Sequence, residues 1–304
     1  MKRMLLSRSL FAAFLLLLSL ASCKKNTWTD DGSQVIQFKD ERFLQAILEN
    51  PRNAVDKNKD GQITINEARA ATLLDVSLAG ISSMEEIKYF TSLTELFCYG
   101  NELTALDVSS NTSLTKLNCS SNELSAIDVG NNPELTLFYC DSNQLSTLDV
   151  SRNTVLKIFG CGLNSITSLD LSRNIVLENI DCNNNLLESL ELGRKVSLQV
   201  LNCNNNRLDV LDVSAAPALT ELNISSNRIS EIDLSSNMAL LELKCTENLL
   251  TLLNLQNNTE LEILACSRNQ LKRLILDRNH KLGQGTISRI TEEYGDIIDY
   301  GWDN

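Results

Sequence analysis

The stretch Leu93–Asn111, LTELFCYGNELTALDVSSN, decides the fold because its pattern recurs nine times in a strict 21-residue phase from Thr91 to Asn279. One column is leucine in every repeat, and another is asparagine in every repeat. The leucines are Leu93, Leu114, Leu135, Leu156, Leu177, Leu198, Leu219, Leu240 and Leu261, and the asparagines are Asn101, Asn122, Asn143, Asn164, Asn185, Asn206, Asn227, Asn248 and Asn269. A fixed period near twenty residues predicts a solenoid, in which each turn buries its apolar side only by stacking on its neighbours.

Each 21-residue unit is itself a near-duplication. The first half reads Leu-x-x-Leu-x-Cys-x-x-Asn, and the second half reads Leu-x-x-Leu-x-Val-x-x-Asn, so each half looks like a short strand followed by a turn. This pattern resembles the leucine-rich repeat family, in particular its short 21-residue class, sometimes called IRREKO. The resemblance covers about two thirds of the chain. It implies a mainly β solenoid of nine turns with two parallel sheets, one strand from each half, and little or no helix between them.

The N-terminus predicts export. Lys2, Arg3 and Arg8 precede an apolar stretch from 10 to 20, which is followed by Leu-Ala-Ser-Cys ending at Cys23. These last four residues resemble a bacterial lipobox, which implies cleavage before Cys23 and a lipid on its sulfur. A plain signal peptide or a membrane helix is the alternative, although the apolar run is too short to span a bilayer comfortably. Lys24 in the next position implies, by the same resemblance, an outer-membrane lipoprotein of the bacterial cell envelope, facing either the periplasm or the medium.

Charge restricts the partners. The net charge is −12, and removal of residues 1–22 would take away three of the 27 basic residues and none of the 39 acidic ones, leaving −15. Nucleic acid is therefore not an expected partner. We expect a monomer that meets the membrane only through its lipid anchor.

The chain divides into six expected segments. These are a signal peptide (1–22), a lipidated tether (23–34), an EF-hand-like calcium-binding cap (35–75), a degenerate capping repeat (76–90), nine leucine-rich repeats (91–279) and a C-terminal cap (280–304). Residues 85–89 look helical within the capping repeat. Ile287, Ile290 and Tyr294 predict a short closing helix, against which Trp302 would also pack.

Residues 56–67, DKNKDGQITINE, fit the pattern D-x-[DN]-x-[DN]-G-x5-E at every specified position. This pattern is that of an EF-hand loop, so the resemblance implies a structural Ca²⁺ ion. Its oxygen ligands would come from Asp56, Asn58, Asp60, the Gln62 carbonyl, Thr64 and Glu67. Pro51 interrupts the helix expected at 40–49, which is similar to the abbreviated hands of dockerin-like modules. A single hand favours stiffening over signalling, and a degenerate loop is the alternative.

Three further columns look chemical but have structural explanations. Eight of the nine cysteines share one column, where parallel stacking at ~4.8 Å points their Cβ atoms in one direction, so we expect buried free thiols rather than disulfides or a metal site. The asparagine column is expected to satisfy backbone groups at the turns. A ladder of aspartates in the second half, including Asp107, Asp128 and Asp149, is expected to be solvated, with a weak divalent-cation strip as the alternative.

No catalytic group is evident: His280 is the only histidine, and no phosphate-binding or dinucleotide motif occurs, so the enzyme hypothesis is remote. Exposed aromatics on one sheet are typical of interfaces. The candidate ligand-binding residues are Phe97, Tyr99, Leu137, Tyr139, Ile158, Asn183, Asn202 and Asn204. Members of the resembled family include adhesins and internalin-like receptors, which implies a protein ligand. An amide-rich stretch beside aromatics would also suit a glycan of a surface polysaccharide system.

Overall fold

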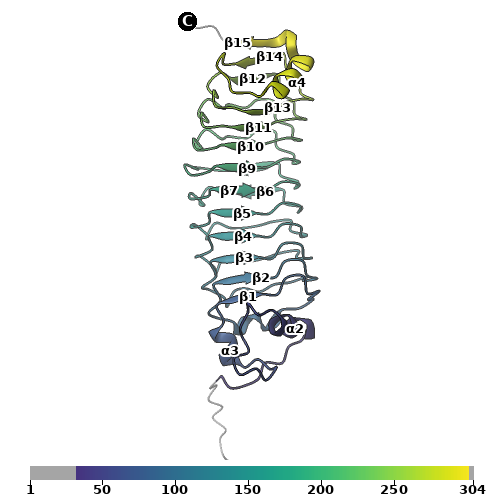
Figure 1. Cartoon of the computed structure of the whole chain (residues 1–304), viewed down its shortest axis with the longest axis vertical. Helices are drawn as coiled ribbons and strands as arrows, with labels where there is room; N and C mark the ends of the chain where they lie inside the picture. Colours follow the sequence, from purple (N-terminus) through teal and green to yellow (C-terminus); the bar gives the residue numbers. More distant parts are fainter. Residues whose placement is uncertain (1–31, 301–304) are drawn as a thin grey trace, which may run out of the picture.

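A computed structural model describes residues 32–300, which form a tall stack of coils with a helical cap at each end (Figure 1). Cys23, the signal peptide, most of the tether and Trp302 lie outside the described residues. Among residues 32–300, no helix combines the length and apolar character needed to cross a membrane.

One continuous parallel sheet of ten strands runs the length of the stack. In spatial order its strands are β1 (Leu73–Asp75), β2 (Glu95–Phe97), β3 (Lys116–Asn118), β4 (Leu137–Tyr139), β5 (Ile158–Gly160), β7 (Asn179–Asp181), β9 (Val200–Asn202), β10 (Glu221–Asn223), β11 (Glu242–Lys244) and β13 (Ile263–Ala265). Each strand pairs with the equivalent residues of the next repeat, as Leu96 does with Leu117. The middle residue of each strand is buried, so the repeat phase predicted from the sequence is confirmed.

The opposite side of the coil forms β-strands in only some of the repeats. A two-stranded sheet contains β6 (Ser168–Asp170) and β8 (Ser189–Glu191), and a three-stranded sheet contains β12 (Leu252–Leu255), β14 (Arg273–Leu276) and β15 (Ile298–Tyr300). The second sheet is therefore discontinuous, whereas the repeat pattern predicted a strand in every second half. Aspartates of this side hold turns both after strand β6, as Asp170 does, and where no strand forms. The Asp149 carboxylate, for example, accepts the Ser151 N–H at 2.8 Å, and hydrogen bonds from Ser151 lower the pKa of Asp149.

The invariant asparagines hold the turns together, as the sequence predicted. Asn122 donates through Nδ2 to the carbonyl oxygens of Cys98 and Cys119 at 3.0 and 3.1 Å, and its Oδ1 accepts the N–H of Leu103 at 3.0 Å. The same contacts recur from turn to turn. Backbone groups that the bends would otherwise bury unpaired are thereby satisfied.

The second-half asparagines form another buried row, which is interrupted in the fifth and sixth repeats. Asn153 donates to the carbonyls of Val129 and Asn132, one repeat earlier. Lys195 and Ala216 replace asparagine in this row. The buried Lys195 ammonium donates to the Leu171 carbonyl at 2.8 Å and also to the Leu192 carbonyl. Burial lowers its pKa to about 8.

All eight repeat cysteines are buried free thiols: Cys98, Cys119, Cys140, Cys161, Cys182, Cys203, Cys245 and Cys266. Burial raises the pKa of Cys98 to about 12 and raises the others as well. The thiols therefore act as small apolar side chains, as expected from their column.

The N-terminal cap covers the first strand edge. It contains helices α2 (Glu41–Glu49) and α3 (Ile65–Ala70) and the 3-10 helix η1 (Glu85–Tyr89). The first and the last match the helices expected at 40–49 and 85–89, and α3 was not predicted. Asn53 exchanges hydrogen bonds with the backbone of Asp75 in β1, at 2.7 and 3.0 Å. These contacts pair an edge that another chain could otherwise extend.

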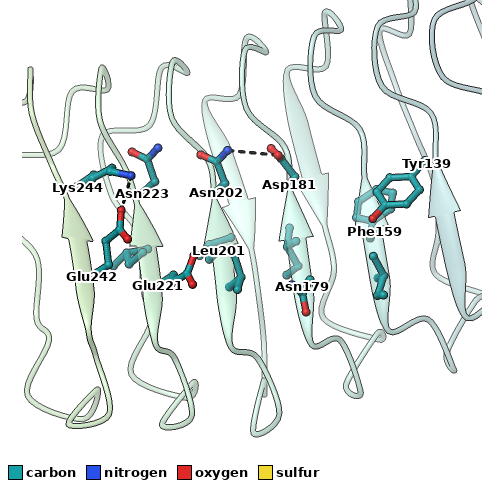
Figure 2. Close-up of a pocket in the computed structure, with 14 residues that line it drawn as sticks. Tyr139, Phe159, Asn179, Asp181, Leu201, Asn202, Glu221, Asn223, Glu242 and Lys244 are labelled. Atoms are coloured by element: carbon teal, nitrogen blue, oxygen red, sulfur yellow. Dashed lines mark hydrogen bonds and ion pairs between the residues drawn. The ribbon is translucent and has the colours of Figure 1, made fainter. Parts of the chain in front are cut away.

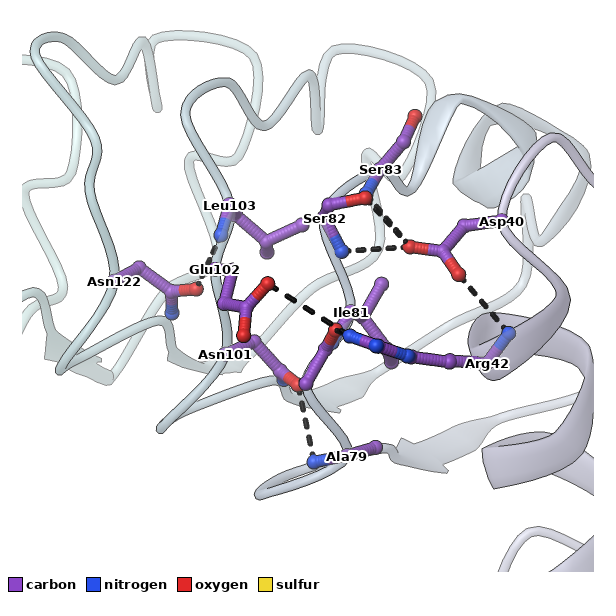
Figure 3. Close-up of polar contacts among 11 residues, drawn as sticks. Asp40, Arg42, Ala79, Ile81, Ser82, Ser83, Asn101, Glu102, Leu103 and Asn122 are labelled. Atoms are coloured by element: carbon purple, nitrogen blue, oxygen red, sulfur yellow. Dashed lines mark hydrogen bonds and ion pairs between the residues drawn. The ribbon is translucent and has the colours of Figure 1, made fainter.

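A second set of contacts fastens α2 to the first repeat (Figure 3). Asp40 caps α2 by accepting the Arg42 N–H at 3.0 Å, while its other oxygen accepts the Ser82 N–H at 2.7 Å. Arg42 donates to the Gly80 carbonyl at 2.6 Å and lies 3.7 Å from Glu102. The cap and the solenoid are thus joined by hydrogen bonds as well as by apolar packing.

At the other end, α4 (Gln284–Tyr294) closes the coil and leads through η2 (Gly295–Ile297) into β15. Ile290 and Tyr294 are buried, and the Tyr294 hydroxyl donates to the Cys266 carbonyl at 3.2 Å. The predicted closing helix is confirmed.

Candidate functional site

On the outer face of the ten-stranded sheet, the outward side chains are exposed or half-buried in every strand, and α4 packs near the last strand, β13 (Figure 1). Strand residues alternate between the core and this face, so the first and third residues of each strand point outward. Within this face the structure contains a recess of about 340 Å³ that spans β4 to β11. Its lining is Tyr139, Ile158, Phe159, Asn179, Ile180, Asp181, Val200, Leu201, Asn202, Glu221, Leu222, Asn223, Glu242 and Lys244.

The recess exists because side-chain size falls and then rises along one outward column (Figure 2). Tyr139 and Lys244 are its large ends, and Gly160, Asp181, Asn202 and Asn223 lie between them. Gly160 is required here: a Cβ at this position would lie 2.5 Å from Cδ1 of Tyr139 and 2.8 Å from Oδ2 of Asp141. The tyrosine ring therefore leans over the glycine of the next strand and forms one wall of the recess.

The polar lining is partly organised by contacts within the recess (Figure 2). Asn202 donates through Nδ2 to the Asp181 carboxylate at 3.3 Å, and Lys244 forms an ion pair with Glu242. Glu221 pairs in register with Glu242, so two carboxylates lie on adjacent strands with one ammonium beside them. Like charges in such positions repel. Ile158 on β5 and Val200 on β9 add apolar surface to the lining.

Three of the eight sequence-predicted ligand residues meet at this recess: Tyr139, Ile158 and Asn202. The other five, Phe97, Tyr99, Leu137, Asn183 and Asn204, are not part of its lining. Phe97 on β2 is separated from Tyr139 on β4 by β3. Two strand spacings are ~9.6 Å, so the three aromatics do not form one cluster.

Sequence reasoning missed Asp181, Glu221 and Glu242 as site residues. They occupy the same outward-facing repeat positions as Phe97 and Glu95, so the alignment of the repeats could have placed them on this face. The alignment could not show the recess, which depends on the glycine at position 160.

The calcium-loop residues form a tightly hydrogen-bonded turn between α2 and α3. Asp56 accepts the N–H groups of Lys59 and Gly61 at 2.7 and 3.0 Å, and Gly61 has a φ of +78°. Ile63 is buried, and its carbonyl accepts the Ile36 N–H at 2.8 Å, beside a β-bridge between Val35 and Thr64. Ile63 thus makes a short β-like contact within the cap.

The other loop ligands are also engaged by their neighbours. Asp60 accepts from Gln62 at 2.8 Å and Asn58 accepts from Asp60 at 3.0 Å, while Glu67 accepts from Lys57 and Thr64. Burial alone would raise the pKa of Glu67, but these hydrogen bonds lower it overall. Within residues 32–300, no three His, Cys, Asp or Glu side chains gather closely enough to hold a metal. The oxygen-rich donor set suits Ca²⁺ chemically, and the loop closes through its own N–H groups.

His280 lies beside the C-terminal cap, where its ring stacks on Tyr300 with centroids 6.2 Å apart. The recess lies on repeats far from this residue, so the two do not form one site.

Comparison with known proteins supports the fold. No protein-family model and no curated protein matches the chain. Among solved structures, it is similar to the functional domain of InlJ from Listeria monocytogenes, described as including a cysteine ladder, with 29% identity, a TM-score of 0.44, and coverage of 73% of this chain and 61% of that one. Internalin C2 from Listeria monocytogenes matches with 21% identity, a TM-score of 0.54, and coverage of 75% and 94%.

The ectodomain of the plant receptor kinase GASSHO1/SCHENGEN3 from Arabidopsis thaliana, in complex with CASPARIAN STRIP INTEGRITY FACTOR 2, matches with 22% identity and a TM-score of 0.55, covering 64% of this chain and 26% of that one. The fold is that of a leucine-rich repeat solenoid. The chain spans less than two thirds of the InlJ domain.

Proposed function

We propose that this chain is a non-catalytic binding module of the bacterial cell envelope, which holds a protein ligand against the recess between Tyr139 and Lys244. The observation that carries the proposal is the recess itself, a hollow on the outer face of the sheet that combines a tyrosine wall, aliphatic surface, three carboxylates and one ammonium. Interfaces concentrate their binding energy on such aromatic anchors within concave surfaces.

Two structural neighbours support a protein ligand. The GASSHO1 ectodomain and the plant peptide hormone receptor RGFR1 were each solved in complex with a ligand, CASPARIAN STRIP INTEGRITY FACTOR 2 and RGF2 respectively. Both share the repeat fold at identities of 22% and 20%. This likeness supports the type of module and leaves the ligand of this chain to the chemistry of its own face.

The proposal includes two features of the N-terminal region. Cys23 carries a lipid that anchors the module in the outer membrane, supported by the lipobox-like residues 20–23. A Ca²⁺ ion binds the loop from Asp56 to Glu67 and stiffens the cap, supported by the complete motif and by the loop's hydrogen-bonded closure.

A glycan ligand is the second candidate, because Asn179, Asn202 and Asn223 present side-chain amides in the same recess as Tyr139. Amides can pair with sugar hydroxyls, and an aromatic ring can pack on a sugar face. We favour a protein because Ile158 and Val200 add aliphatic surface to the recess.

The test uses residues 24–304 as bait in parallel on a glycan array and against envelope and host-protein extracts. Tyr139→Ala should lose the ligand, with roughly 2 kcal/mol or more of binding energy lost if Tyr139 is a true anchor. Tyr99→Ala is the matched control, because Tyr99 is also an exposed tyrosine of the repeats but does not line the recess. Ligand retained by Tyr139→Ala, or lost equally in both variants, would contradict the site. Binding on the array alone would select the glycan.

A further inference from the structure

A row of exposed apolar side chains runs along one corner of the coil, away from the recess. It lies at the turn that leads from the second half of each repeat to the next strand, directly after the second asparagine column. Ile175, Val196 and Met238 are 52%, 46% and 62% exposed, and Pro217 is also exposed. One position further on, Val155, Val176, Ala218 and Ala239 extend the row. We call these eight residues the apolar ridge.

The ridge has sharp limits. The column that holds Val155 and Val176 has Glu134 in the third repeat and Glu260 in the ninth. The apolar side chains therefore occupy the fourth to eighth repeats, with acidic residues beyond both ends. Scattered surface apolar residues need no explanation, but a contiguous row with charged limits points to a contact.

Arginines flank the ridge on the same turns. Arg152, Arg173 and Arg194 occupy one column in three successive repeats, each just before the buried row that separates them from the ridge. All three are exposed, and none belongs to an ion pair found among residues 32–300. Arg152 and Arg173 do lower the pKa of Asp149 and Asp170 at longer range, after the stronger effect of the neighbouring serines. Carboxylates of the aspartate ladder therefore lie on the same side of the coil, and the three stacked guanidinium groups are the cations next to the ridge.

The shape of this corner selects among possible partners. A crest one to two side chains wide is narrow for a stable protein interface, which buries ~800 Å² on each partner. In a two-fold dimer whose two ridges pack antiparallel, the arginine rows of the two copies would lie against each other. A bilayer is different, because a straight row can touch a plane along its whole length while arginines extend to the phosphates.

We propose that this corner of the solenoid lies on a phospholipid surface, with the apolar ridge at the level of the headgroups and the three arginines on lipid phosphates, so that the body adds a membrane contact to the lipid anchor, which the sequence analysis expected to be the only one. The contact is separate from the recess and does not depend on the proposed ligand. It draws on the expected lipid anchor, because a short tether of about nine residues from Cys23 to Gly32 can extend only ~30 Å. At the high effective concentration that such a tether gives, a weak contact is enough to orient the body.

The test replaces the lipid by a hexahistidine tag ahead of residues 24–304 and tethers the protein to phosphatidylcholine vesicles that contain phosphatidylglycerol and a nickel-chelating lipid. A polarity-sensitive thiol dye reports from Val196→Cys on the ridge. The matched control is Leu163→Cys, at the opposite corner of the coil and 56% exposed. The eight buried repeat cysteines are not expected to react.

On tethering, the dye at position 196 should shift to the blue, and the dye at 163 should not. Arg152→Gln/Arg173→Gln should reduce the shift at 196, whereas Arg207→Gln/Arg228→Gln, two exposed arginines in another column, should leave it unchanged. Equal spectra at 163 and 196 would overturn the proposal, as would no shift at either. A shift that grows with protein concentration in the absence of vesicles would assign the ridge to a second copy and would also overturn it.

Discussion

Lys195 offers a quantitative test of how the repeats are held together, because its ammonium donates to two carbonyl groups that would otherwise need two asparagines. In the regular rows, each second-half asparagine donates to a carbonyl 24 residues earlier, as Asn174 does to Val150 and Asn237 does to Val213. At position 195 that carbonyl is Leu171, and at position 216 it would be Leu192. The Lys195 ammonium reaches both. Ala216 leaves room for the longer lysine.

The two substitutions should therefore compensate for each other. Lys195→Asn keeps a donor for Leu171 but leaves the Leu192 carbonyl buried without one, which costs about 1–3 kcal/mol. Ala216→Asn alone adds atoms to a filled interior, at a further cost of about 1–3 kcal/mol. The double variant restores two regular asparagine rungs and should regain most of the stability of the parent. The expected coupling energy is thus about 2–6 kcal/mol, larger than additivity error between independent sites.

The assay is urea unfolding of the four proteins of this cycle, followed by circular dichroism at pH 7. Comparable m-values must be obtained, since a repeat array can lose cooperativity when one interface weakens. If the two single losses of stability simply add in the double variant, the reasoning is refuted. The Lys195 ammonium would then not be taking the place of an asparagine at position 216 as the donor to the Leu192 carbonyl.

A pH series on the same proteins tests the charge. The pKa of Lys195 is lowered from 10.5 to about 8 by burial. Between these two values the unfolded chain binds the extra proton and the folded chain does not, so unfolding free energy contributed by this group rises with pH. The cost of burying the ammonium is present below pH 8 and is relieved as pH rises toward 10.5, by up to about 3 kcal/mol. The measured quantity is the difference in unfolding free energy between the parent and the double asparagine variant, a comparison that cancels the titration of other groups. A difference that does not change with pH would contradict the lowered pKa of Lys195.

Three further predictions concern other parts of the molecule. Calcium should raise the melting temperature of residues 24–304. At a hundredfold excess over Kd the added free energy of unfolding is about 2.7 kcal/mol, and Asp60→Ala or Glu67→Ala should remove it. Identical melting curves with calcium and with chelator would contradict the site. In a protein lacking Cys23, the eight repeat cysteines should resist a bulky thiol reagent when folded and should all titrate in denaturant, so a count below eight without reductant would reveal disulfides. Gly160→Ala should displace the Tyr139 ring, which lies 2.5 Å from the added Cβ, and weaken ligand binding without unfolding the solenoid; unchanged affinity would show that the tyrosine wall is dispensable.

Much of the fold was predictable because a repeat multiplies every local signal nine times. The leucine, cysteine and asparagine columns specified the core, the register and the turns together. Both caps were visible as breaks in those columns, and the structure confirms the helices at 41–49 and 284–294. The discontinuous second sheet was not predicted. Its aspartates match the strand phase equally well: Asp107 accepts the Ser109 N–H at 2.9 Å where no strand forms, and Asp170 accepts the Ser172 N–H at 2.8 Å at the end of β6, so they do not distinguish the two cases.

The recess was only partly predictable. Outward columns could be read from the phase, so Tyr139, Ile158 and Asn202 were placed on the correct face. The hollow depends on how Tyr139 leans over Gly160, a contact between residues 21 positions apart that belong to different repeats. Exposure of aromatics was therefore a poor guide to which of them share a surface. The double duty of Lys195 was hidden for the same reason, because the alignment showed two exceptions without showing that they are neighbours.

Photo-crosslinking from the recess tests the proposed binding surface most directly. A photoreactive phenylalanine analogue replaces Asn202 in the recess or, as the matched control, Ala126, which is exposed on the opposite side of the coil. Both proteins are irradiated with the same envelope and host-protein extracts. We predict a crosslinked partner from position 202 only, competed away by excess unlabelled parent protein and not by Tyr139→Ala. Equal crosslinking from position 126, or full competition by Tyr139→Ala, would contradict the claim that this face holds the ligand.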